Sequence, residues 1–99
     1  MKNVYPAVFY NQKQFVGVVV PDIKGCQTFG ENMADAIEMA EDAIALMIAR
    51  IEDDGYEVPS PSTISQIEQR LKDGDIEIFG TNPEVFSIEI NTDRFFEDS

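Results

Sequence analysis

One long amphipathic segment, residues 32–54, most constrains the fold of this chain. Asn32 is a favourable N-cap, Asp35 echoes a capping box three residues later, and Gly55 suits the position after the last helical turn. Apolar residues recur at alternating steps of three and four, which predicts a buried helical stripe made of Ile37, Ala40, Ile44, Met47 and Ile51. A helix this long must pack that stripe against another layer of the protein.

The opposite side of the same helix is predicted to face water. Its positions are mostly acidic, and the remaining ones are alanines; they are Asp35, Glu38, Asp42, Ala45, Ala49 and Glu52. We therefore expect Ala45 to be exposed, together with the carboxylates around it.

Three short segments before the helix have the composition of β-strands. Residues 4–10 (VYPAVFY), 15–20 (FVGVVV) and 26–29 (CQTF) are rich in β-branched and aromatic side chains. The polar turn at 11–14 predicts a hairpin between the first two, and the second strand is apolar enough to be central. Pro6 favours an edge position or the beginning of its strand, because proline donates no hydrogen bond to a ladder.

The chain beyond the helix contains a linker, a short helix and a last strand. Residues 56–65 hold two prolines, residues 63–75 show helical spacing of Ile64, Ile67 and Leu71, and residues 84–91 alternate as in a half-buried strand. The predicted fold is α+β with two layers: an antiparallel-dominated β-β-β-α-β sheet with one long helix on one face. We expect a single domain over residues 1–99.

The formal net charge of −12 is unevenly distributed along the chain. Residues 1–30 sum to +2, residues 31–58 to −8 and residues 59–99 to −6. Such a surface repels nucleic-acid phosphates and attracts basic proteins, although acidity can also serve solubility alone.

Several kinds of site are excluded by composition. The chain has no histidine and one cysteine, so it can form neither a Ser-His-Asp or Cys-His nucleophile nor an internal disulfide, and it gives no signal for zinc. It has no phosphate-binding glycine motif, no apolar run long enough to cross a bilayer and no signal-peptide pattern. We expect a cytoplasmic protein with no membrane contact, no cofactor and no metal.

The stretch PDIKGCQTFG, residues 21–30, is interpreted as a structural turn. Pro21 fixes φ, Asp22 can accept backbone hydrogen bonds, and Gly25 takes a conformation that other residues avoid. Gly30 is expected to break the third strand. The alternative is a loop that contacts a partner. Cys26 lies beside a predicted strand with no activating base, which indicates a small buried residue rather than a reactive thiol.

Four fragments occur in the order and spacing of a known family. YPAVFY, PDIKGCQTFG, ADAIEMAEDAI and DDGYEVPSPS, which together span about residues 4–62, resemble the HicB family of antitoxins, and residues 85–90 fit the family's last strand. The helix start departs from the family pattern, with Asn32 and Met33 where threonine or serine is frequent and Asp35 in place of glutamate.

The resemblance implies an antitoxin with a partial ribonuclease-H-like fold. Its expected partner is a HicA-type toxin, a small basic ribonuclease that cleaves messenger RNA. Many members carry a further DNA-binding domain, and because this sequence stops eight residues after Asn91, we expect no direct DNA binding by this chain alone.

The toxin-binding surface is predicted at the acidic end of the long helix, where the four carboxylates are Glu52, Asp53, Asp54 and Glu57. A solvated helix end is the alternative reading of these residues. We also expect a homo-oligomer, because a mostly apolar sheet is poorly covered by one helix.

Two other function classes stay open. One is a stand-alone oligomeric interaction module without a toxin. The other is a carboxylate-dependent enzyme built on Asp22, Glu31 and Asp35, although the first strand lacks the carboxylate that active ribonuclease-H-like enzymes place there.

Overall fold

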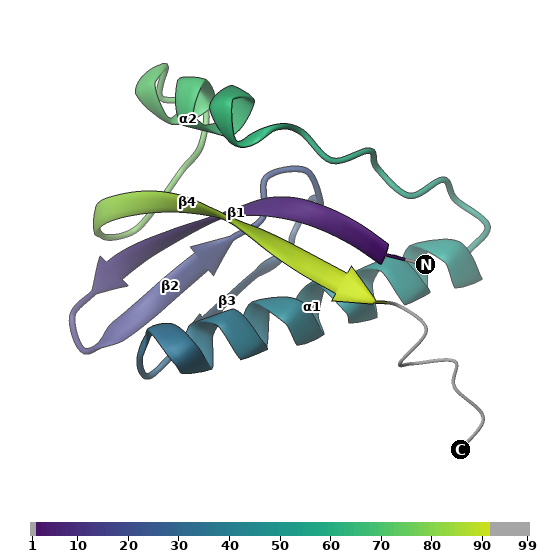
Figure 1. Cartoon of the computed structure of the whole chain (residues 1–99), viewed down its shortest axis with the longest axis horizontal. Helices are drawn as coiled ribbons and strands as arrows, with labels where there is room; N and C mark the ends of the chain where they lie inside the picture. The colour runs from purple at the N-terminus through teal and green to yellow at the C-terminus, as the bar shows by residue number, and fades with distance from the viewer. Residues whose placement is uncertain (1, 92–99) are drawn as a thin grey trace.

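The chain folds into one antiparallel sheet and two helices (Figure 1). The computed structural model describes residues 2–91. The elements follow one another in the order β1 (Lys2–Gln12), β2 (Phe15–Val19), β3 (Gln27–Gly30), α1 (Met33–Asp53), α2 (Ile64–Lys72) and β4 (Thr81–Asn91). Every strand and helix predicted from the sequence is present in the described residues.

The sheet has the strand order β3-β2-β1-β4, and every neighbouring pair is antiparallel. The prediction of an antiparallel sheet is therefore confirmed. β1 is an inner strand rather than an edge, with Pro6 opposite Ser87 of β4. Pairing with β2 starts only at Val8, so Pro6 lies near the beginning of β1, where its missing N–H removes nothing from the β1–β2 ladder.

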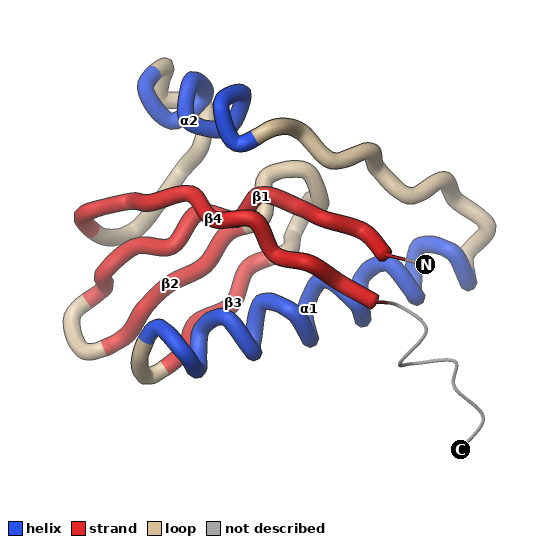
Figure 2. The backbone as a smooth tube through the Cα atoms, in the orientation of Figure 1, coloured by secondary structure: helices blue, strands red, loops and turns tan. Residues whose placement is uncertain are grey.

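Helix α1 packs on one face of the sheet and forms the main core with it (Figure 2). Alternate side chains of the strands meet the helix: Tyr5, Ala7 and Phe9 from β1, with Ile88 and Ile90 from β4. The helix begins as predicted, because Asn32 Oδ1 accepts a hydrogen bond from the Asp35 N–H and Asp35 accepts one from the Glu31 N–H.

The buried face of α1 is broader than the predicted stripe. Its fully buried residues are Ala36, Ala40, Ile44, Ala45 and Ile48, whereas Ile37, Met47 and Ile51 are partly buried. The assignment of Ala45 to the exposed side is wrong, since only 1% of its surface is accessible. A methyl side chain is short enough to be covered at the flank of the buried face, so a position next to the apolar stripe can be buried when it is an alanine.

The second face of the sheet is covered by α2 and the segment that follows it. Ile67 of α2 and Ile76 pack with Val8, and Val19 and Val85 lie against them. Figure 1 shows α1 and α2 on opposite sides of the strands. The prediction of two layers with a helix on one face must therefore be corrected to a sheet with a helix on each face. The partial ribonuclease-H-like fold that the family resemblance implies stays a prediction.

Candidate functional site

The turn between β2 and β3 is built by its own backbone. The Ile23 N–H donates to the Val20 carbonyl at 3.1 Å, the Cys26 N–H to the Ile23 carbonyl at 3.0 Å, and the Val20 N–H to the Cys26 carbonyl at 3.0 Å. Gly25 has a φ of +80°, a conformation that disfavours side chains. This geometry is consistent with the interpretation of Pro21 and Gly25 as parts of a structural turn. Whether the loop also contacts a partner protein stays a prediction.

Asp22 was expected to accept hydrogen bonds within the turn, but its hydrogen-bond partner lies 40 residues away in the sequence. Its carboxylate accepts two hydrogen bonds from Ser62, one from the backbone N–H at 2.7 Å and one from the hydroxyl at 2.6 Å. Tyr5 makes a parallel connection, since its hydroxyl donates to the Pro59 carbonyl at 2.6 Å. The two contacts fasten the segment 56–63, here called the strap, to the sheet.

Gly30 is required for a close approach between β3 and α1. A Cβ atom at this position would collide with the backbone of Asp35 and Ala36 in the first turn of the helix. The collision involves main-chain atoms, so no side-chain rotation could relieve it. Gly30 therefore fixes how the acidic helix leaves the sheet.

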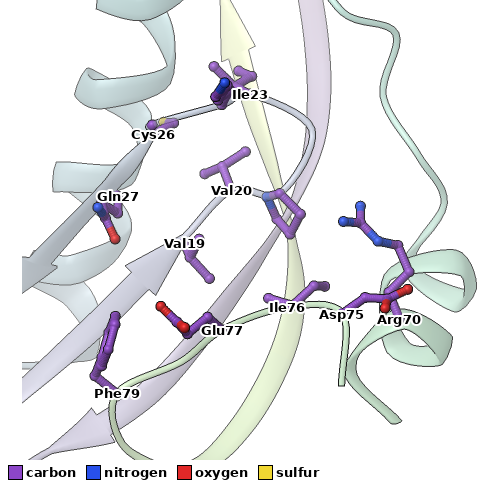
Figure 3. A pocket seen from close by; sticks show the side chains of 13 residues that line it. Val19, Val20, Ile23, Cys26, Gln27, Arg70, Asp75, Ile76, Glu77 and Phe79 are labelled. Atoms are coloured by element: carbon purple, nitrogen blue, oxygen red, sulfur yellow. The ribbon is translucent and has the colours of Figure 1, made fainter. Parts of the chain in front are cut away.

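A cavity of about 330 Å³ lies between this turn and the segment that follows α2 (Figure 3). Pro21, Ile23 and Cys26 line one side of it, and Arg70 and Glu77 lie on the other. Burial raises the pKa of the Cys26 thiol to about 11, so the thiol is neutral near pH 7. Cys26 is thus a buried structural residue, as the sequence indicated.

The four carboxylates proposed for partner binding are gathered at one end of α1. Glu52 and Asp53 belong to its last turn, Asp54 is the C-cap, and Glu57 follows in the strap. All four are exposed, as expected from the sequence. Burial raises the pKa of the Tyr5 hydroxyl, and the charges of Asp22 and Glu52 raise it further.

The structure does not assemble the alternative carboxylate centre. Asp22 bonds to the strap, whereas Asp35 caps the start of α1 next to Glu31. Within residues 2–91, no three His, Cys, Asp or Glu side chains are grouped so that they could hold a metal ion.

Two surface features were not found by sequence reasoning. A groove of about 460 Å³ lies between α2 and the beginning of β4, lined by Leu71, Val85 and Phe86 among others. On β2 and β3, Phe15 and Phe29 are exposed and contact each other edge to face, with ring centroids 5.5 Å apart. Strand alternation gives the face of each residue, but the extent of the covering helix is needed to tell which apolar residues stay exposed.

No helix among the described residues is long and apolar enough to cross a membrane.

The fold is shared with solved structures of toxin–antitoxin proteins. A chain of a toxin–antitoxin complex from Streptococcus pneumoniae aligns with a TM-score of 0.79 at 22% identity, over 96% of this chain and 73% of that chain. The N-terminal domain of the Burkholderia pseudomallei antitoxin HicB aligns at 0.62 and 24%, over 84% and 94%. These two likenesses show the fold alone.

A third structure and a family model extend the comparison to the sequence. A chain of the HicA3 and HicB3 toxin-antitoxin complex aligns with a TM-score of 0.68 at 26% identity, over 89% of this chain and 98% of that chain. No curated protein sequence gives a significant match. The model of the HicB_like antitoxin of bacterial toxin-antitoxin systems matches residues 5–80, which include the turn, both helices and the strap. The chain therefore belongs to the HicB-like antitoxin family.

Proposed function

We propose that the chain neutralises a small, basic, mRNA-cleaving toxin of the HicA type by covering the surface with which the toxin binds RNA. Family membership supports the antitoxin role, and the similarity to a chain of the HicA3 and HicB3 complex supports the type of partner. The proposed action is binding, without chemistry on the toxin or on RNA.

The acidic end of α1 is the observation that carries the mechanism. Four exposed carboxylates lie within six residues, and Arg50 is the single cation in the last turn of the helix. Residues 31–99 as a whole carry a formal charge of −14. A surface of this kind competes with RNA for a basic protein, because both present dense negative charge.

Charge on an exposed surface acts mainly on how fast partners meet. Complementary potentials steer the encounter and raise the association rate, while buried apolar contacts hold the complex. Salt screens exposed charges over about 8–10 Å near physiological ionic strength. Association with the toxin should therefore slow as the salt concentration rises.

The test neutralises the acidic end while keeping the shape of its side chains. The variant combines Glu52→Gln, Asp53→Asn, Asp54→Asn and Glu57→Gln. It is compared with the wild type for association with a HicA-type toxin that the wild type binds, at low and high salt, and for protection of cells that express that toxin. We expect a loss of about tenfold or more in association rate at low salt, with an unchanged melting temperature.

A matched control removes the same number of charges elsewhere on the surface. It combines Glu31→Gln, Glu38→Gln, Asp75→Asn and Glu77→Gln, all at exposed positions. The control should bind closer to wild type than the first variant does. If the first variant binds and protects as well as the wild type, the acidic end is not the contact surface.

A further inference from the structure

The outer edge of β4 has no partner strand among residues 2–91. β4 is the last strand of the sheet, pairs only with β1, and is 11 residues long. The free edge of such a strand presents alternate backbone N–H and C=O groups that can pair with another extended chain.

An apolar groove adjoins the first half of this strand. It lies between α2 and β4 and has a volume of about 460 Å³. Leu71 comes from the helix, while Pro83, Val85 and Phe86 come from the strand. Leu71 and Val85 are half-buried on the face of the sheet that α2 covers. Phe86 belongs to the opposite face, where it packs edge to face on Phe9, and it keeps 39% of its surface exposed at the edge of the strand. The groove can therefore accept one apolar side chain from outside.

The rim of the groove carries more negative than positive charge. Glu68 from α2 and Glu84 from β4 are exposed there, against one cation, Lys72. β4 and α1 run in the same direction, so the strand proceeds toward the side of the molecule where the acidic end of α1 lies (Figure 1).

We propose that β4 and this groove bind an extended basic segment of the partner protein. The segment pairs with the edge of β4 as an added strand and places one apolar side chain between α2 and β4, with its basic residues beside Glu68 and Glu84. An exposed strand edge next to a helix groove combines backbone hydrogen bonds for affinity with a side-chain pocket for specificity. This inference rests on the proposed function in one respect, since it takes the basic toxin as the partner.

A second copy of the chain fits this surface less well. Two β4 edges paired with each other would bring together two rims that each carry Glu68 and Glu84, and like charges brought close are destabilising. A basic segment instead converts both carboxylates into favourable contacts.

The first test follows the backbone of β4 directly. Amide hydrogen exchange is measured on the chain alone at two concentrations and in complex with the same HicA-type toxin. We expect outward-facing amides of β4 to exchange at least tenfold more slowly in the complex, while amides of the other edge strand, β3, change little. Protection of β4 that rises with the concentration of the free chain would overturn the proposal, since the occupant would then be a second copy.

The second test uses two substitutions with matched controls. Glu68→Lys combined with Glu84→Lys should weaken toxin binding at least tenfold, and more than the equal charge change of Glu31→Lys with Glu38→Lys. Phe86→Ser should weaken binding, whereas Phe79→Ser, at an exposed position outside the groove, should not. Thermal melts verify that each variant is folded.

The outcomes separate this inference from the proposed function. If the toxin is bound and neutralised but β4 gains no protection, and the Glu68 and Glu84 substitutions behave like their control, this inference is wrong and the proposed function stands. If the wild-type chain binds no HicA-type toxin, both are wrong.

Discussion

Asp22 and Tyr5 show how single residues of this family pattern act over long sequence distances. The Asp22 carboxylate bonds to Ser62, 40 residues later, and the Tyr5 hydroxyl bonds to Pro59, 54 residues later. The tyrosine of the first strand, the aspartate of the turn and the proline–serine strap therefore form one connected unit. The tyrosine and the aspartate both depend on the strap for their hydrogen-bond partners, since Tyr5 donates to Pro59 and Asp22 accepts from Ser62.

Removal of the Asp22 carboxylate should loosen the strap without unfolding the sheet. Asp22→Ala deletes both hydrogen bonds to Ser62, and hydrogen bonds to a charged group contribute about 1.5–3 kcal/mol each, so we expect a loss of about 2 kcal/mol or more in the free energy of unfolding. Urea denaturation measures it. Ser62→Ala keeps the backbone bond and should cost less. Equal stability of Asp22→Ala and the wild type would show that the clamp contributes nothing.

At the scale of elements, the ends of helix α1 were predicted correctly, whereas its buried face was predicted only in part. Its ends follow from local chemistry, namely the Asn32 cap and Gly55 with a φ of +81°. Its buried face depends on the sheet beneath it, which gives Ile48 and Ala45 a burial that the apolar spacing did not assign.

The buried face of α1 seen in the structure predicts how much three substitutions in this helix should lower the free energy of unfolding. Ile44→Ala should cost about 2–4 kcal/mol through lost burial and a cavity. Ala45→Lys should cost about 2 kcal/mol or more, because the position is buried and a long charged chain must displace its neighbours. Leu46→Lys is the control, at a position that is 64% exposed. If denaturant melts found Ala45→Lys as mild as Leu46→Lys, the described rotation of the helix would be wrong.

The sequence predicted the elements well and the contacts between them poorly. Caps, turn glycines and alternation are local signals, so the order of strands and helices along the chain, the α1 cap at Asn32 and the burial of Cys26 all follow from neighbours in the chain. The bond from Asp22 to Ser62 and the groove beside Phe86 depend on residues that meet only after folding. The exposure of the four proposed contact carboxylates was predictable, whereas their role stays a proposal.

At the scale of the whole molecule, each face of the sheet has a helix, but the coverage is unequal. α1 spans the length of its face, whereas the much shorter α2 leaves Phe15 and Phe29 exposed on the opposite side, at 44% and 58% of their surface. Phe79 is exposed nearby and shares a small pocket with Phe29. Exposed aromatic groups of this kind are typical of interfaces between proteins.

We therefore still expect the chain to self-associate, and we expect these exposed phenylalanines to form the contact. Light scattering should give a mass above that of the monomer at high micromolar concentration. Phe29→Ser should shift the equilibrium toward monomer, while Tyr56→Ser, in the strap at 74% exposure, should not. A strictly monomeric wild type under these conditions would contradict the prediction.

The position of β1 between the second strand and the last one also determines when the domain can be completed during synthesis. β1 is translated first and β4 last, yet Tyr5 lies opposite Ile88 in the finished sheet. Because chains emerge from the ribosome with the N-terminus first, one edge of β1 has no partner until β4 has been translated. A nonsense mutation before β4 removes Ile88 and Ile90 from the core and leaves a central strand half-paired, so we expect truncated translation products not to fold.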